Sequence, residues 1–164
     1  MLKAIRDLIT ELTSDVPQRQ FEANDERLAV AALLVHLISV DGVVKPAERT
    51  AIEQTLAGQY GLSSEDTAQL IAQADRMDEE AVDLYGFTSV LKRALDEDGR
   101  RRVIEMMWEA VFADGAASEF EENTVWRVAE LLGISSRDRI TLRQRVAHGH
   151  VSDKPAKEAD KDAG

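Results

Sequence analysis

The stretch Asp41-Gly-Val-Val-Lys-Pro-Ala-Glu48 decides the fold, because it recurs in kind as Asp114-Gly-Ala-Ala-Ser-Glu-Phe-Glu121. Each copy lies between two segments that carry apolar residues at helical spacing. The offset that aligns the two copies also aligns residues outside the turn, such as Leu34 with Met107. The chain is therefore predicted to be a duplicated helical hairpin, in which each half buries its apolar face against the other.

Apolar residues recur at three- and four-residue spacing along most of the chain, as at Leu28, Ala31 and Val35. No segment alternates with a period of two over the length of a strand. The predicted fold is all-α, a single domain of about seven to eight helices built from two related helical-hairpin halves. The predicted helices span residues 2–13, 24–40, 46–59, 64–79, 81–95, 98–113, 119–132 and 136–147.

Three parts are expected along the chain. Residues 1–23 are predicted to form an N-terminal helix and linker, and residues 24–148 the two-halved helical domain. Residues 149–164 contain almost no apolar side chains, which is too little to offset the entropy of ordering, so they are predicted to be a disordered tail.

Composition excludes several classes of function. The net charge of −11 argues against a nucleic-acid partner, whose phosphates require lysine and arginine. The sequence has no cysteine, which excludes disulfides, a thiolate zinc site and a cysteine nucleophile. No stretch reaches the roughly 20 apolar residues needed to span a bilayer, so a soluble, cytoplasmic protein without direct membrane insertion is expected. Nothing in the sequence fixes the oligomeric state.

The sequence contains no recognisable catalytic machinery. It lacks a Glu-x-x-His di-iron pair, a glycine-rich phosphate loop after a strand and a Gly-x-Ser-x-Gly elbow, so no enzyme activity is expected. Trp108 and Trp126 are interpreted as interhelical packing residues. His36 is interpreted as a residue at the edge of the core. The alternative is that it supports Asp41 as a hydrogen-bonding partner behind a metal site. His148 and His150 are interpreted as a chance pair in a polar tail, with weak chelation of a soft divalent ion as the alternative.

The two turns have a purely structural interpretation. Ser118-Glu-Phe-Glu121 matches a capping box, and Lys45-Pro-Ala-Glu48 places proline at the first helical position and glutamate at the third. Gly42 and Gly115 suit the left-handed residue that ends a helix. The aspartate before each glycine would then close its turn by accepting backbone amides.

The functional interpretation starts from the position of the two aspartates. Asp41 and Asp114 each follow a helix, where the helix dipole disfavours an anion. If the pseudo-twofold brings both turns together, Glu48 and Glu121 complete a set of four carboxylates, which would repel unless protons or a cation compensate. An all-oxygen site selects a hard divalent cation, Ca²⁺, Mg²⁺ or Mn²⁺, and the spacing differs from an EF-hand loop. Both interpretations stay open.

Several stretches resemble the TerB-like family, which is associated with bacterial tellurite resistance. They are Leu84-Tyr-Gly-Phe-Thr88, Leu91-Lys-Arg-Ala-Leu95, Met107-Trp-Glu-Ala-Val-Phe-Ala-Asp-Gly115 and Glu121-Glu-Asn-Thr-Val-Trp-Arg-Val-Ala-Glu-Leu-Leu-Gly133. The resemblance covers roughly residues 25–147 and is strongest in the second copy.

The resemblance implies an all-helical domain of two related halves with an acidic cluster that binds a divalent metal. The positions that match that cluster are Asp41, Glu48, Asp114 and Glu121. The expected function is that of a non-enzymatic, metal-binding stress-response protein that acts through protein partners. The alternative is a metal-independent helical module for protein–protein interaction or scaffolding, in which the acidic turns only cap helices.

Overall fold

The computed structural model describes residues 21–22, 25–40, 42–79, 84–115 and 117–153. Within these ranges the chain forms seven α-helices and one short 3-10 helix, and it contains no strand. The elements are α2 (Glu26–Ser39), α3 (Pro46–Tyr60), α4 (Ser64–Glu79), α5 (Leu84–Ala94), α6 (Glu97–Val111), η1 (Phe112–Asp114), α7 (Glu119–Leu131) and α8 (Ser136–Asp153). The predicted all-α class is confirmed.

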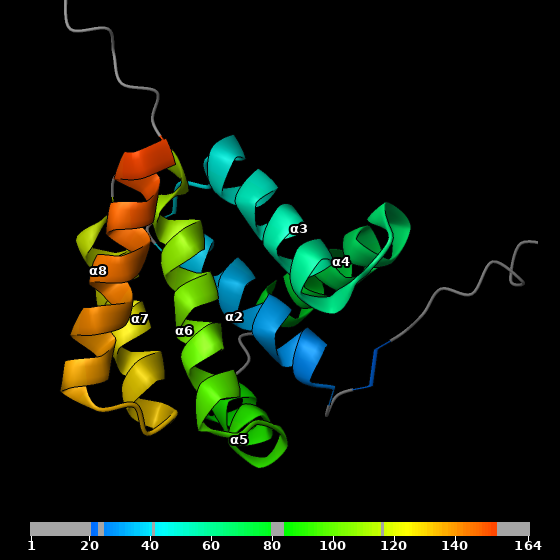
Figure 1. The fold of residues 1–164 in the computed structure, drawn as a ribbon. Helices are drawn as coiled ribbons and strands as arrows, with labels where there is room; N and C mark the ends of the chain where they lie inside the picture. Colours follow the sequence, from blue (N-terminus) through cyan, green and yellow to red (C-terminus); the bar gives the residue numbers. More distant parts are fainter. Residues whose placement is uncertain (1–20, 23–24, 41, 80–83, 116, 154–164) are drawn as a thin grey trace, which may run out of the picture.

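The helices follow the predicted duplication. Helices α2, α3 and α4 form one half, and α6, α7 and α8 follow in the same order in the other, with α5 between them (Figure 1). Helices α2 and α6 pack against each other, α4 packs on α2, and α8 packs on α6. The first helix of each half therefore lies at the centre, and the last helix of each half lies outside it.

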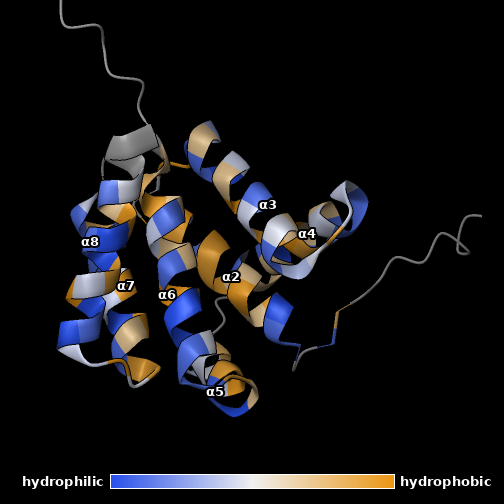
Figure 2. Ribbon diagram, viewed as in Figure 1, coloured by the Kyte–Doolittle hydropathy of each residue, from blue (hydrophilic) through white to orange (hydrophobic). Residues whose placement is uncertain are grey.

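Helix α2 is the centre of the core. Ten of its residues are buried, including Leu28, Leu34 and Ile38, and they cover all sides of the helix. Apart from its charged first turn it is almost continuously hydrophobic, and it lies among the other helices with α8 outside (Figure 2). A helix that is apolar on every side must be enclosed by other elements, which explains why α3, α4, α5, α6 and α7 all contact it.

Aspartate side chains cap the N-termini of the two central helices, α2 and α6. The Asp25 carboxylate accepts a hydrogen bond from the Arg27 backbone N–H at 2.9 Å, and the Asp96 carboxylate accepts one from Gly99 N–H at 2.8 Å. These bonds satisfy amides that have no partner within the helix. Hydrogen bonds from Arg27 also hold the pKa of the Asp25 carboxyl below its usual value.

The observed helices differ from the predicted ones mainly at their C-terminal ends. The predicted helix 98–113 ends as an α-helix at Val111 and continues as the 3-10 turn η1. Helix α8 runs to Asp153 instead of 147, so it enters the segment that was predicted as a disordered tail from residue 149. Stop signals follow both observed ends, Gly115 after η1 and Pro155 two residues beyond Asp153, so the prediction for α8 ended too early because it followed the apolar periodicity alone. The predicted helix 2–13 lies outside the described residues.

One residue of the predicted linker, Phe21, belongs to the hydrophobic core. Phe21 is 5% exposed, and its backbone N–H and C=O pair with the side-chain amide of Gln73 at 3.0 and 2.8 Å. The Arg27 guanidinium lies 4.8 Å from the centre of its ring. An isolated phenylalanine carries no helical periodicity, so the pattern could not assign it to the core.

Candidate functional site

The two hairpin turns are closed by glycines in the left-handed conformation, as predicted. Gly42 has φ of 79° and Gly115 has φ of 87°, and the Gly115 N–H donates to the Phe112 carbonyl at 2.9 Å. Both turns lie at the same end of the domain, near the start of α3 (Figure 1). Asp41 lies outside the described residues. Asp114 is the last residue of η1, and its side chain is likewise outside the description.

Glu48 occupies the third position of α3 and is 1% exposed. Pro46 begins the helix, and Lys45 at the cap position makes no side-chain capping bond. The Lys45 ammonium lies 3.9 Å from Glu48 Oε1. Burial of a glutamate in the first turn of a helix is unusual, because such a residue can serve the helix dipole while exposed to water.

Glu121 occupies the equivalent third position of α7 and is fully buried. The predicted capping box is present, since Glu121 Oε1 accepts from the Ser118 N–H and Ser118 Oγ accepts from the Glu121 N–H, both at 3.2 Å. The second carboxylate oxygen, Oε2, is buried and has no hydrogen-bond partner among the described residues. Capping therefore accounts for one oxygen of Glu121 and leaves the other without an explanation.

The glutamate-bearing helix of the first half contacts the acidic turn of the second half. Helix α3, which carries Glu48, packs against η1, which ends at Asp114. The first half therefore brings its glutamate-bearing helix to the acidic turn of the second half. A buried carboxylate needs a proton or a cation to offset the loss of hydration, so the chemistry of this donor set fits a hard cation.

The structure does not by itself assemble a complete metal site. Among the side chains it describes, no three histidine, aspartate or glutamate groups come together in a way that could hold a metal ion. The two aspartates of the four-carboxylate set, Asp41 and Asp114, contribute no described side chain to that test. The set thus divides into two buried glutamates with described side chains, Asp114 with only its backbone described, and Asp41, which lies outside the described residues.

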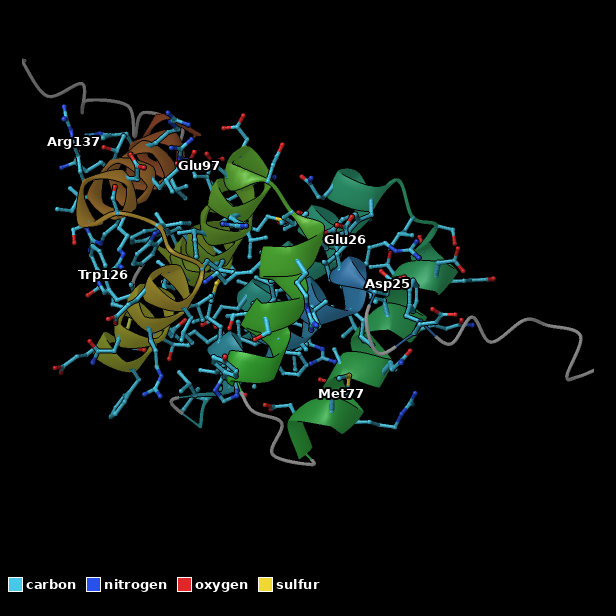
Figure 3. All side chains as sticks on the ribbon, turned by 90° about the horizontal axis from the view of Figure 1, so that it is seen from below. Asp25, Glu26, Met77, Glu97, Trp126 and Arg137 are labelled. Carbon is cyan, nitrogen blue, oxygen red and sulfur yellow. The ribbon has the colours of Figure 1, made fainter. Side chains whose placement is uncertain are left out.

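The aromatic residues of the second half form a packed cluster, as predicted. Trp108 is fully buried, stacks on Phe112 with ring centres 5.6 Å apart and meets Trp126 edge-on at 6.3 Å. Trp126 and Arg137 lie at one end of the domain, with Asp25 and Met77 toward the other (Figure 3). The tryptophans therefore join α6 and α7 and are explained by packing.

His36 is half-buried at the edge of the core, as predicted. Its Nδ1 lies 2.8 Å from Asp78 Oδ1, and the Ser39 hydroxyl donates to Asp78 Oδ2 at 3.1 Å. These contacts join the C-terminal ends of α2 and α4. The alternative role of His36 beside Asp41 falls outside the described residues.

The fold and the buried acidic positions define an all-helical domain of two related hairpins with paired acidic turns. The family model described as tellurite resistance protein TerB matches residues 27–144. The chain belongs to this family. No helix among the described residues is long and apolar enough to cross a membrane.

A solved structure of a protein of unknown function from Porphyromonas gingivalis W83 has a similar fold. The TM-score is 0.56 at 17% sequence identity, and the match covers 77% of this chain and 98% of the other. At this identity the similarity concerns the fold alone. A search of curated proteins gave no significant match.

Proposed function

We propose that this protein is a non-enzymatic helical domain that binds a hard divalent cation between its two acidic turns and acts through protein partners in a cytoplasmic stress response. The cation would be Ca²⁺, Mg²⁺ or Mn²⁺. Its ligands would be Asp41 and Glu48 from the first half and Asp114 and Glu121 from the second. The bound ion would supply positive charge that joins the two halves at their turns.

The observation that carries this proposal is the burial of Glu121 with one carboxylate oxygen unpartnered among the described residues. A buried charged oxygen without a donor is costly, and proteins retain such a group where a ligand or proton completes it. The equivalent burial of Glu48 in the first half adds support, because capping requires neither glutamate to be buried.

A metal-independent interaction module is the competing function. Exposed apolar side chains flank both turns, with Val43 at 59%, Val44 at 47% and Phe120 at 65% exposure. Apolar side chains on a surface favour a protein contact there, whether or not metal is bound.

Thermal melts in the presence of different ions distinguish the two functions. Because a ligand that binds only the folded state adds RT ln(1 + [L]/Kd), an ion at 100 times its Kd should contribute about 2.7 kcal/mol. For a domain of this length the melting temperature should rise by roughly 5–10 °C. Ca²⁺, Mg²⁺ or Mn²⁺ should produce this rise, and sodium chloride of equal ionic strength should not.

The matched control is the variant with all four carboxylates neutralised, Asp41→Asn, Glu48→Gln, Asp114→Asn and Glu121→Gln. It should melt at the same temperature with and without the divalent ion. If no divalent ion raises the melting temperature of the wild-type protein more than sodium chloride does, the metal-binding proposal is wrong and the interaction module takes its place.

A further inference from the structure

In each half, the residue after the buried glutamate forms an ion pair with the last helix of that half. After Glu48, the Arg49 guanidinium lies 2.5 Å from Asp75 of α4. After Glu121, Glu122 pairs with Arg143 of α8, whose Nε donates to Glu122 Oε1 at 3.1 Å. The charges are reversed between the halves, but both pairs connect a glutamate-bearing first turn to the outer helix.

Arg143 makes further contacts that tie together three elements of the second half. Its guanidinium carbon lies 5.6 Å from the ring centre of Trp108 and 5.5 Å from that of Phe112. From α8 it thus reaches α6 through Trp108, η1 through Phe112 and the first turn of α7 through Glu122. Phe112 opens the turn that leads into Gly115, and Glu122 follows Glu121 directly.

The first half cannot reproduce this arrangement. The offset that aligns the two acidic turns places Val35 opposite Trp108 and Ser39 opposite Phe112, and neither is aromatic. The two halves therefore share the ion pair to the outer helix, which Arg49 makes with Asp75, but not the contacts with aromatic rings. A guanidinium is planar, so one face can lie against a ring while its edge donates to a carboxylate, and an ammonium has neither the flat face nor the planar set of donors.

We propose that Arg143 is the positioning residue for the second half of the acidic site. It fixes η1 and the first turn of α7 relative to each other, and so fixes where the buried carboxylate of Glu121 lies. This inference rests on the proposed function for its consequence in metal binding. The positioning itself exists in the metal-free protein and can be measured there.

The test uses the full chain and three variants, Arg143→Gln, Arg143→Lys and the control Arg145→Gln. Arg145 lies on the same helix and pairs with Glu105 at 3.1 Å, but its side chain is 66% exposed. Calcium binding by isothermal titration calorimetry should weaken by about 10–100-fold in Arg143→Gln, the range typical of residues that orient a metal ligand. The calcium affinity of Arg143→Lys should lie between those of wild type and Arg143→Gln, because lysine keeps the charge and loses the planar guanidinium, and the control should match wild type.

Hydrogen exchange of the metal-free proteins supplies the second readout. In Arg143→Gln the backbone amides of Gly115, Glu121 and Glu122 should exchange at least about tenfold faster than in the control, because local opening controls their protection. The amides of Glu48 and Arg49 in the first half should be unchanged.

Each outcome decides a different point. Equal exchange at the second-half amides in Arg143→Gln and Arg145→Gln overturns the positioning role. A variant that melts at a lower temperature but binds calcium as wild type does would show that Arg143 only stabilises the fold. If wild type itself binds no calcium, magnesium or manganese, the proposed function fails, and the exchange experiment still decides whether Arg143 holds the turn of Glu121.

Discussion

Ser118 and Glu121 are joined by two reciprocal hydrogen bonds at the start of α7, each 3.2 Å long. The pair satisfies two backbone amides and uses only one of the two carboxylate oxygens of Glu121. Helix capping and metal binding can therefore coexist in the same glutamate. They can also be separated by substitution, because Ser118 takes part only in the first.

Replacing Ser118 with alanine should lower the free energy of unfolding by about 0.5–2 kcal/mol, because the Glu121 amide loses its acceptor. The loss should be the same with and without calcium, since the hydroxyl is not a proposed ligand. Urea denaturation in both conditions measures it. The equivalent substitution at Ser135, whose hydroxyl accepts from Asp138 N–H at the start of α8, provides a capping control away from the turns. If the loss of unfolding free energy depended on calcium for Ser118→Ala but not for Ser135→Ala, Ser118 would belong to the metal site, contrary to this prediction.

Replacing Glu121 with glutamine should have opposite consequences in the two conditions. Without metal the variant should be as stable as wild type or more stable, because a neutral amide keeps the acceptor for Ser118 and removes a buried charge. With calcium in excess it should lose the metal-dependent rise in melting temperature. Glu119→Gln, at an exposed position of the same helical turn, is the control and should keep the rise. Equal destabilisation of Glu121→Gln in both conditions would favour capping alone.

Truncation of Leu34 to alanine should cost about 2–5 kcal/mol, because the side chain is fully buried on the central helix α2, which five other helices contact. Chemical denaturation provides the measurement. Val44→Ala removes apolar atoms from a side chain that is 47% exposed and should change the stability by less than about 0.5 kcal/mol. A comparable cost at both positions would contradict the central place of α2.

Tyr60 should make the protein sensitive to alkali. Burial, reinforced by the nearby charges of Glu26 and Asp25, raises the pKa of its phenol from 10.0 to about 12. The folded-state pKa is above the unfolded value, so this stabilisation is fully present below pH 10 and is lost as the pH rises to about 12. Melting curves of Tyr60→Phe should therefore decline less steeply over that interval than those of wild type. The 65% exposed Tyr85 supplies the control Tyr85→Phe, which should follow wild type.

The sequence predicted the fold well because the signals that define it are local. Helical periodicity located α3 and α4 to within a residue, and glycine located the turns at Gly42 and Gly115. Helix α8 extended beyond its prediction because its last residues are polar and its apolar periodicity stops before the helix does. Local pattern predicts the part of a helix that is buried and does not predict where a polar stretch of helix ends.

The candidate site was predicted less completely. The capping box at Ser118 was evident from its spacing, but the burial of Glu121 depends on how α7 packs within the domain. The contacts of Arg143 join residues from α6, η1, α7 and α8, and no spacing rule spans such distances. The only available signal was the opposite charge of Glu122 and Arg143, which many other pairs in this charged sequence share.

Equilibrium dialysis of the full chain against calcium, magnesium and manganese tests the central claim most directly. The account predicts that wild type binds one ion per chain, and that Glu48→Gln and Glu121→Gln each weaken that binding by roughly tenfold or more, since each half supplies ligands. Failure of all three ions to bind to wild type would contradict the claim, and so would binding that neither substitution weakens.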